Sequence, residues 1–120
     1  MWETVASFYG REDAIQDGVL VDVTKTAREA GFKFPVAVTQ ALWNNYIIPH
    51  STMNGQSEQE RLWDVLYVAA QYAKYSKDDS MFFGIDFLMG TVIEQVDLKL
   101  LIFLGDRREP VITIMLQQED

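Results

Sequence analysis

The first quarter of the chain holds the residues whose types and spacing come nearest to a chemical site. Residues 11–24, REDAIQDGVLVDVT, place Glu12, Asp13, Asp17 and Asp22 within eleven positions. Carboxylates that converge in space can bind a divalent cation such as Mg²⁺, or can share the roles of general acid and general base. Their chemistry therefore depends on whether the fold brings them to one point.

Each of these four carboxylates also has a local structural explanation. Glu12 and Asp13 open a short helix expected after a glycine, where the helix dipole favours negative charge. Asp17 stands before a glycine in a turn, where its side chain can bond nearby backbone groups. Asp22 alternates with two valines and should point away from the core. We therefore assign them no metal and no catalytic role, and expect a solvent-exposed surface that binds a partner.

The remaining reactive side chains form no catalytic signature. The chain has one histidine, His50, and no cysteine, which excludes a disulfide, a thiolate zinc site and a cysteine nucleophile. His50 lies in a polar loop, where a solvated side chain is expected rather than a general base. Ser51, Thr52 and Ser57 lack a strand-turn-helix nucleophile motif, and the isolated glycines form no phosphate-binding loop. No catalytic residue, metal or cofactor is predicted.

The charge balance narrows the classes of partner. Eighteen acidic and ten basic residues give a formal net charge of -8. Such a field repels nucleic acid and anionic membranes and attracts basic protein surfaces, although acidity also simply keeps a small protein soluble. Asp78 and Asp79, in the turn DDS, form a second group of candidate partner-binding acids. Direct binding to nucleic acid or to a membrane is not expected.

The length predicts a single domain over residues 1–120. A chain of this size can bury enough surface to fold without a metal or a disulfide. The first residues show no basic start followed by an apolar run, and no apolar stretch approaches about 18 residues, the length that spans a bilayer. A cytoplasmic protein is therefore expected.

Two similar sequence segments, VDVT at 21–24 and VAVT at 36–39, occur in the first half of the chain. Residues 19–23, VLVDV, predict a strand, and Thr24 is expected to cap a helix that ends at Gly31. The phrase VAVT then repeats the pattern of VDVT. Either an extended piece again leads into a helix capped by threonine, or Pro35 is the first residue of a helix over 35–47.

The clearest helix spans residues 57–75. Ser57 and Glu60 form a capping box, and an apolar stripe follows at helical spacing. The stripe consists of Leu62, Val65, Leu66, Ala69, Ala70 and Ala73.

Four aromatic residues belong to this helix and to the one before it. Trp63 and Tyr67 flank the apolar stripe, and Trp43 and Tyr46 lie three apart on the preceding helix. We expect all four to pack in the core or at its edge. The alternative is a set of exposed anchors, because tryptophan and tyrosine are common hot-spot residues of interfaces.

The last third of the chain changes to a strand period. Three strands are expected over 81–89, 92–104 and 110–116, joined by tight turns into an antiparallel meander. The predicted fold class is α+β, with a helical N-terminal half packed on a three- to four-stranded antiparallel sheet from the C-terminal half. The strand at 19–23 is the candidate fourth strand.

Both faces of this sheet carry apolar residues. Leu101 and Phe103 should face away from the core, and the last strand has apolar residues on both sides. Such a sheet is either covered twice or pairs with another molecule. We therefore expect a partner-binding face or a homo-oligomer.

Several stretches read together resemble a family of small uncharacterised proteins carried by phages, plasmids and other bacterial mobile elements. They are REDAIQDGVLVDVT, AREAGF, PVAVTQALW, RLWDVL and the terminal PVITIML followed by QQED. The resemblance covers most of the chain except 44–60 and 75–100. The family has no assigned chemistry, so it implies no catalytic residue, only a small acidic protein made inside a bacterium by a mobile element.

The expected function is that of a non-enzymatic interaction protein. It would bind, and so inhibit, a basic host protein that handles nucleic acid or serves in defence, through Glu12, Asp13, Asp17 and Asp22. Two alternatives remain open. One is a small metal-dependent hydrolase with aspartate and glutamate ligands, and the other is a structural homo-oligomer.

Overall fold

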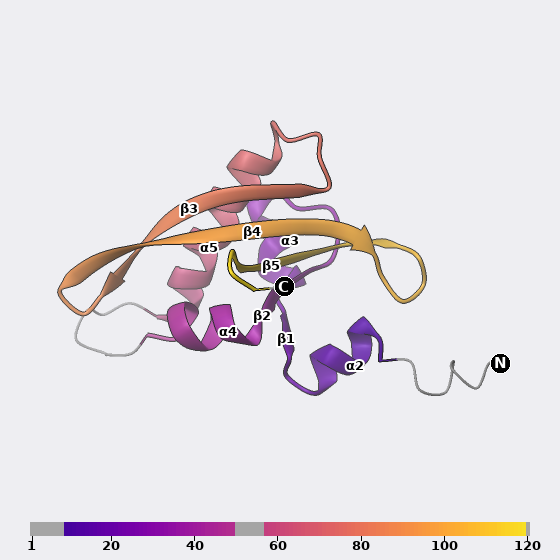
Figure 1. The fold of residues 1–120 in the computed structure, drawn as a ribbon, viewed down its shortest axis with the longest axis horizontal. Helices are drawn as coiled ribbons and strands as arrows, with labels where there is room; N and C mark the ends of the chain where they lie inside the picture. Colours follow the sequence, from indigo (N-terminus) through magenta and orange to yellow (C-terminus); the bar gives the residue numbers. More distant parts are fainter. Residues whose placement is uncertain (1–8, 50–56, 120) are drawn as a thin grey trace.

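Helices cover one face of a five-stranded mixed sheet in this computed structural model, which describes residues 9–49 and 57–119 (Figure 1). In chain order the elements are α2 (Arg11–Gln16), β1 (Leu20–Asp22), α3 (Thr24–Ala30), β2 (Val36–Thr39), α4 (Gln40–Leu42), the π-helical turn η1 (Trp43–Ile47), α5 (Glu58–Ala73), β3 (Ser80–Met89), β4 (Val92–Leu104) and β5 (Pro110–Leu116).

The strand order in the sheet is β1-β2-β5-β4-β3. The meander of β3, β4 and β5 is antiparallel, as expected, and so is the pair β1-β2. β2 and β5, however, are parallel, with Val36 opposite Ile112 and Val38 opposite Ile114. The α+β class and the candidate fourth strand at 19–23, observed as β1, are confirmed. The expected antiparallel sheet is wrong, because β2 adds a fifth strand that pairs in parallel with β5.

β2 resolves the alternatives left open for VAVT. Val36, Ala37 and Val38 are all fully buried, because this central strand is covered on both faces. The helix expected to begin at Pro35 begins only at Gln40, where Thr39 caps it by accepting a hydrogen bond from the Leu42 N–H. The reading of an extended piece that leads into a helix capped by threonine is confirmed for this copy.

The first copy, VDVT, differs by one residue from its expected cap. Thr24 is the first helical residue of α3, and its N–H and hydroxyl both donate to Asp22 Oδ1. The Asp22 carboxylate, and not the Thr24 hydroxyl, therefore accepts a hydrogen bond from a backbone N–H at the start of this helix. Gly31 ends the helix with φ of 113°, the left-handed conformation that favours glycine.

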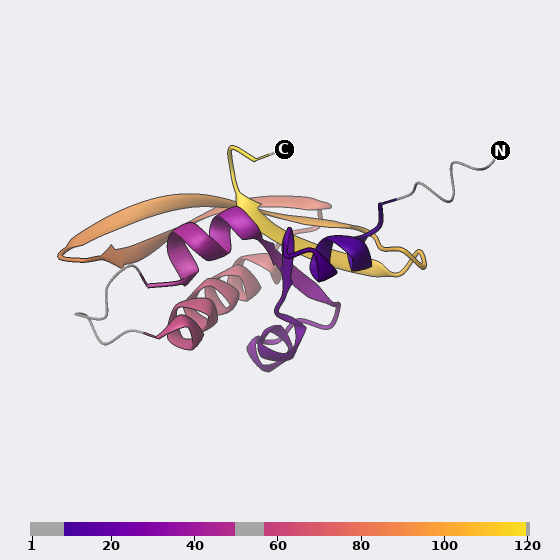
Figure 2. The same cartoon turned by 90° about the horizontal axis from the view of Figure 1, so that it is seen from below.

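The main core lies between the sheet and α5. The capping box of Ser57 and Glu60 is confirmed, since each side chain accepts from the other residue's backbone N–H. Figure 2 shows α3, α4 and α5 on the same side of the sheet, with the C-terminus on the other side. The buried stripe of α5 and the facing strands share one core cluster, which includes Leu62, Val65, Leu66, Ala69, Phe83, Leu98, Leu100 and Ile114.

The aromatic residues divide between two environments. Trp43 and Tyr46 pack against the core, as expected. Trp63 and Tyr67 do not, and the expectation that they lie in the core is wrong, since they are 37% and 50% exposed. Each follows a fully or almost fully buried leucine by one residue, which turns it about a quarter of the way round the helix. Their rings lie 6.2 Å apart on the outer flank of α5.

The β3–β4 hairpin extends beyond the rest of the sheet. Residues 92–97 of β4 pair only with β3, because the pairing of β4 with β5 is confined to residues 98–104 of β4. The buried Arg61 of α5 holds this extension from below, on the helix side. Its guanidinium donates to the carbonyls of Tyr46 (2.7 Å) and Leu88 (2.9 Å) and lies 5.1 Å from the ring centre of Phe87. Burial lowers the pKa of Arg61 from its ordinary value.

Candidate partner-binding surface

The short helix α2 docks on the turn between β4 and β5 through one carboxylate. Asp106 accepts hydrogen bonds from the backbone N–H groups of Arg11 (2.8 Å) and Glu12 (2.9 Å). These two bonds stabilise the ionised form and lower the pKa of Asp106. A β-carbon at Gly10 would lie 2.7 Å from Asp106 Oδ1, so the glycine is what permits this approach. We call residues 10–17, 22 and 105–109 the α2 corner.

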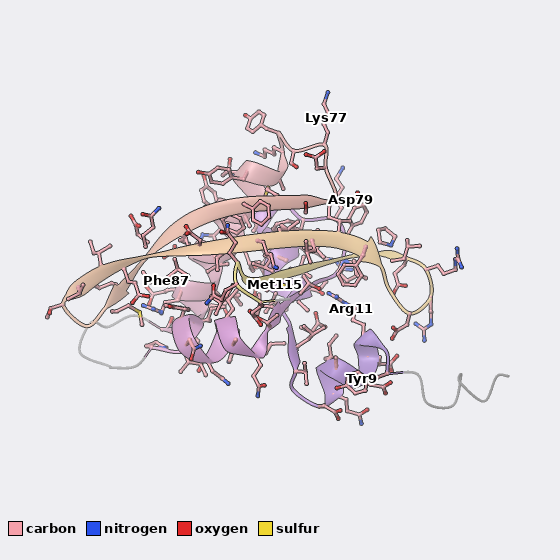
Figure 3. All side chains as sticks on the ribbon, in the orientation of Figure 1. Tyr9, Arg11, Lys77, Asp79, Phe87 and Met115 are labelled. Carbon is pink, nitrogen blue, oxygen red and sulfur yellow. The ribbon has the colours of Figure 1, made fainter. Side chains whose placement is uncertain are left out.

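Arg11 fastens the same helix to the sheet. Its guanidinium donates to Thr113 Oγ1 (2.7 Å) and to the Ile112 carbonyl (2.6 Å), and lies 5.7 Å from the ring centre of Phe103. Burial lowers its pKa from the ordinary value. Figure 3 places Arg11 between α2 and the sheet. Its positive charge is therefore half-buried against β5, close to the carboxylates of Asp22, Asp106 and Glu109.

The fold brings two of the four N-terminal acids to one hollow. Glu12 and Asp22 line a space of about 290 Å³ together with two acids of the β4–β5 turn, Asp106 and Glu109. The other residues around it are Arg11, Ile15, Thr24, Pro35, Arg107 and Val111. The hollow thus mixes carboxylates with guanidinium groups, and it is a surface feature rather than a deep cleft.

Asp13 and Asp17 lie on other sides of α2. Asp13 accepts from the Gly10 N–H (3.1 Å) at the start of the helix. Asp17 accepts from the Tyr9 hydroxyl (2.9 Å), which raises the pKa of that tyrosine. All four N-terminal acids are exposed to solvent, as expected.

The second acidic group is not part of the α2 corner. Asp78 and Asp79 are exposed and directly precede β3, which is the opposite edge strand of the sheet from β1. Figure 3 shows Asp79 well separated from Arg11 and Tyr9. A small partner surface cannot cover both groups at once.

Two members of the hollow are missing from the residues singled out in the sequence. Asp106 and Glu109 belong to GDRRE, which the sequence identifies only as a turn. The bond from Asp106 to α2 joins residues 95 positions apart, so no local spacing could reveal it. The one available signal is the dense charge of residues 106–109, which is high for a tight turn.

Acid should loosen α2 before it unfolds the body of the protein. The pKa of Asp106 is lowered in the fold, so its contribution to stability is present above the ordinary aspartate value of about 3.9 and is lost as the pH falls through the lowered value. The protection factors of the Arg11 and Glu12 amides, which are corrected for the slower intrinsic exchange in acid, should therefore fall as the pH drops below about 4. Asp106→Asn should lower them at neutral pH, whereas Asp86→Asn should not. Equal exchange in all three proteins would contradict this docking.

The face of the sheet opposite α5 is partly covered. Leu101 and Phe103 face away from the core, as expected, and share that face with Val111, Thr113 and Met115 of β5. Arg11 covers one end. Glu119 covers another, where its carboxylate accepts from the Thr39 hydroxyl (2.7 Å) and the Leu116 N–H (2.9 Å). Phe103 nevertheless remains 45% exposed.

The described residues contain neither a candidate metal site nor a candidate membrane-spanning helix. Among residues 9–49 and 57–119, no group of three or more histidine, aspartate or glutamate side chains is placed to hold a metal ion. No helix in those ranges is long and apolar enough to cross a bilayer. His50, Ser51 and Thr52 lie outside the described residues.

Comparison with known proteins places the chain in a family. A model described as a family of unknown function, DUF6573, matches residues 3–120, and the chain belongs to this family. No curated protein and no solved structure matches it.

Proposed function

We propose that this member of the DUF6573 family is a non-enzymatic interaction protein that binds the basic surface of a protein partner through the α2 corner. The observation that carries the proposal is the unequal display of charge there. Glu12, Asp13, Asp17 and Asp22 are all exposed, whereas the guanidinium of Arg11 is bonded to β5.

Electrostatics then act mainly on the rate of association. Exposed carboxylates steer a basic partner toward the α2 corner over a distance of about 8–10 Å at physiological salt, and added salt screens that attraction. The overall charge of -8 acts in the same direction. The turn arginines Arg107 and Arg108 oppose it locally, and they favour a partner surface that carries some acidic residues of its own.

We place this interaction in the cytoplasm of a bacterium, in the service of a mobile element, on the strength of the sequence resemblance. The partner would be a host protein that handles nucleic acid or takes part in defence. A groove built to bind phosphates is lined with lysine and arginine, so an acidic surface can occupy it and exclude the nucleic acid. Inhibition of that protein is the proposed outcome.

Glu12 offers the cleanest charge test at this surface. Within the described residues, its carboxylate makes no hydrogen bond, whereas Asp13 and Asp17 each accept one and Asp22 accepts two. Glu12→Lys should therefore change the charge of the α2 corner without removing a hydrogen bond that holds α2. Asp79→Lys makes the same change of net charge at the opposite edge of the sheet.

The experiment is a pull-down from a bacterial lysate at low and high salt with the wild type and both variants. A basic protein should be retained by the wild type and by Asp79→Lys at low salt, released at high salt, and lost with Glu12→Lys. Equal retention by all three proteins would refute the electrostatic proposal. Loss with Asp79→Lys alone would move the binding surface to the second acidic group.

A further inference from the structure

We propose that the free edge of β3 binds an extended basic segment of a protein partner by β-strand addition. This site is separate from the α2 corner, because β3 and β1 form opposite edges of the sheet. β-Strand addition takes its affinity from main-chain hydrogen bonds and its specificity from alternate side chains. Both kinds of feature are present along β3.

The pairing register shows which backbone groups of β3 are free. Antiparallel neighbours alternate between hydrogen-bonded and non-bonded pairs. The Ile102 N–H donates to the Asp79 carbonyl, so the odd-numbered residues of β3 bond to β4. The even-numbered residues therefore direct their N–H and C=O groups away from the sheet. The Leu88 carbonyl fits this rule, since it accepts from Arg61 outside the ladder.

β3 lacks most of the devices that protect an edge strand. Natural edges are blunted by proline, lysine, bulges or short length. Residues 80–89 contain no proline and no lysine, and they pair with β4 in an unbroken register without a bulge. No strand within the described ranges pairs with the outer side of β3. Asp86 is the one charged side chain on this strand.

The side chains beside the free edge indicate the chemistry of the occupant. Phe82 is 62% exposed and Asp86 is exposed, and both lie on the face opposite α5. Asp97 is also exposed on this face and pairs with Gly84 between them. The two acids suit a lysine or arginine of the added strand, and the exposed aromatic ring suits an apolar residue of the same strand. Because Phe82 and Asp86 are four apart, their partners on an added strand should also be four apart.

The opposite side of the edge supplies further aromatic contacts. Tyr72 of α5 is 52% exposed and stacks on Phe83 of β3, with ring centres 5.9 Å apart. Tyr75, just beyond the end of α5, is 86% exposed. Tyrosine is among the residue types that most often anchor a partner at an interface.

A second copy of the chain fits this edge less well than a basic segment. Antiparallel pairing of two β3 strands about Gly84 would place Asp86 opposite Phe82 of the other copy and provide no cation for it. It would also bring together two chains that each carry a formal charge of -8. Charge complementarity therefore favours the basic partner.

The test uses a synthetic nonapeptide, Thr-Val-Lys-Val-Thr-Val-Leu-Val-Thr, which places lysine and leucine four apart on one face. Its control is the same peptide with every backbone amide N-methylated, which keeps the charge and removes the donors. At saturation, the unmodified peptide should slow hydrogen exchange at the amides of Phe82, Gly84 and Asp86. The methylated peptide should neither bind nor protect them.

Variants separate the edge from the rest of the surface. Asp86→Lys should weaken peptide binding about tenfold, because repulsion replaces attraction of the same cation. Phe82→Ala should also weaken it. Phe103→Ala removes a comparably exposed ring on β4, away from the edge, and should leave binding unchanged. Thermal melting of each variant verifies that the fold is retained, including that of Phe103→Ala, which removes the ring beside Arg11.

Three results would overturn the proposal. The methylated peptide could bind as tightly as the unmodified one, or protection could appear away from β3. Alternatively, light scattering could show a dimer whose β3 amides are protected without peptide, which would make a second copy the occupant. None of these results bears on the α2 corner, which is tested by Glu12→Lys in the pull-down.

Discussion

Replacing Arg61 with alanine is expected to lower the free energy of unfolding by about 3 kcal/mol or more. Arg61 is only 4% exposed, and its guanidinium bonds the carbonyls of Tyr46 and Leu88. Alanine would leave both carbonyls without that donor and remove the cation from beside Phe87. Since these contacts join α5, η1 and β3, the loss should be felt across the whole fold.

Lysine should not substitute for Arg61. Its ammonium is a point charge without the planar fork that allows arginine to bond two carbonyls while lying over an aromatic ring. Chemical denaturation of the wild type, Arg61→Ala and Arg61→Lys measures the effect. Arg28→Ala removes an exposed arginine of α3 and should change stability by less than about 0.5 kcal/mol. A similar small change for Arg61→Ala would contradict the structural role of this residue.

Leu66→Ala should lower the free energy of unfolding by about 3–5 kcal/mol, because the Leu66 side chain is fully buried in the core between α5 and the sheet. The neighbouring Tyr67 provides a matched comparison on the other flank of the helix. It is half exposed, and Tyr67→Ala should cost no more than about 1 kcal/mol, mostly from its contact with Trp63. Denaturant midpoints of the two variants measure the difference. If Tyr67→Ala proved the more damaging change, the assignment of the faces of α5 would be wrong.

The elements that the sequence predicts well are those specified by local patterns. The meander of β3, β4 and β5 follows from alternating apolar residues and glycine-containing turns, and α5 follows from its capping box and apolar stripe. In each case the signal lies within a few residues of the element that it specifies. Such local patterns predict secondary structure well because they depend on neighbouring residues and not on the rest of the fold.

β2 shows where local patterns fail. The four residues after Pro35, of which the first three are buried, resemble the start of a helix as much as a strand. Their parallel pairing with β5 depends on residues some 75 positions later. The prediction that Trp63 and Tyr67 are buried fails for a related reason. Large aromatic residues next to an apolar stripe suggest burial, but the position of the partner layer decides which flank is covered.

Only some residues of the α2 corner could be predicted from the sequence. Glu12, Asp13, Asp17 and Asp22 attract attention because they are close in the chain, and the structure places all four at the surface. Asp106 escapes notice because its role arises only when the β4–β5 turn meets the start of α2. The free edge of β3 likewise requires the strand order, which no local motif contains.

The most direct test of the α2 corner is the salt dependence of the association rate between this protein and the basic partner retained in the pull-down. The wild type should associate quickly at low salt and progressively more slowly as salt rises. Glu12→Lys should associate more slowly at low salt and show a flatter dependence, whereas Asp79→Lys should follow the wild type more closely. Superimposable curves for the wild type and Glu12→Lys would show that the α2 corner does not steer the partner.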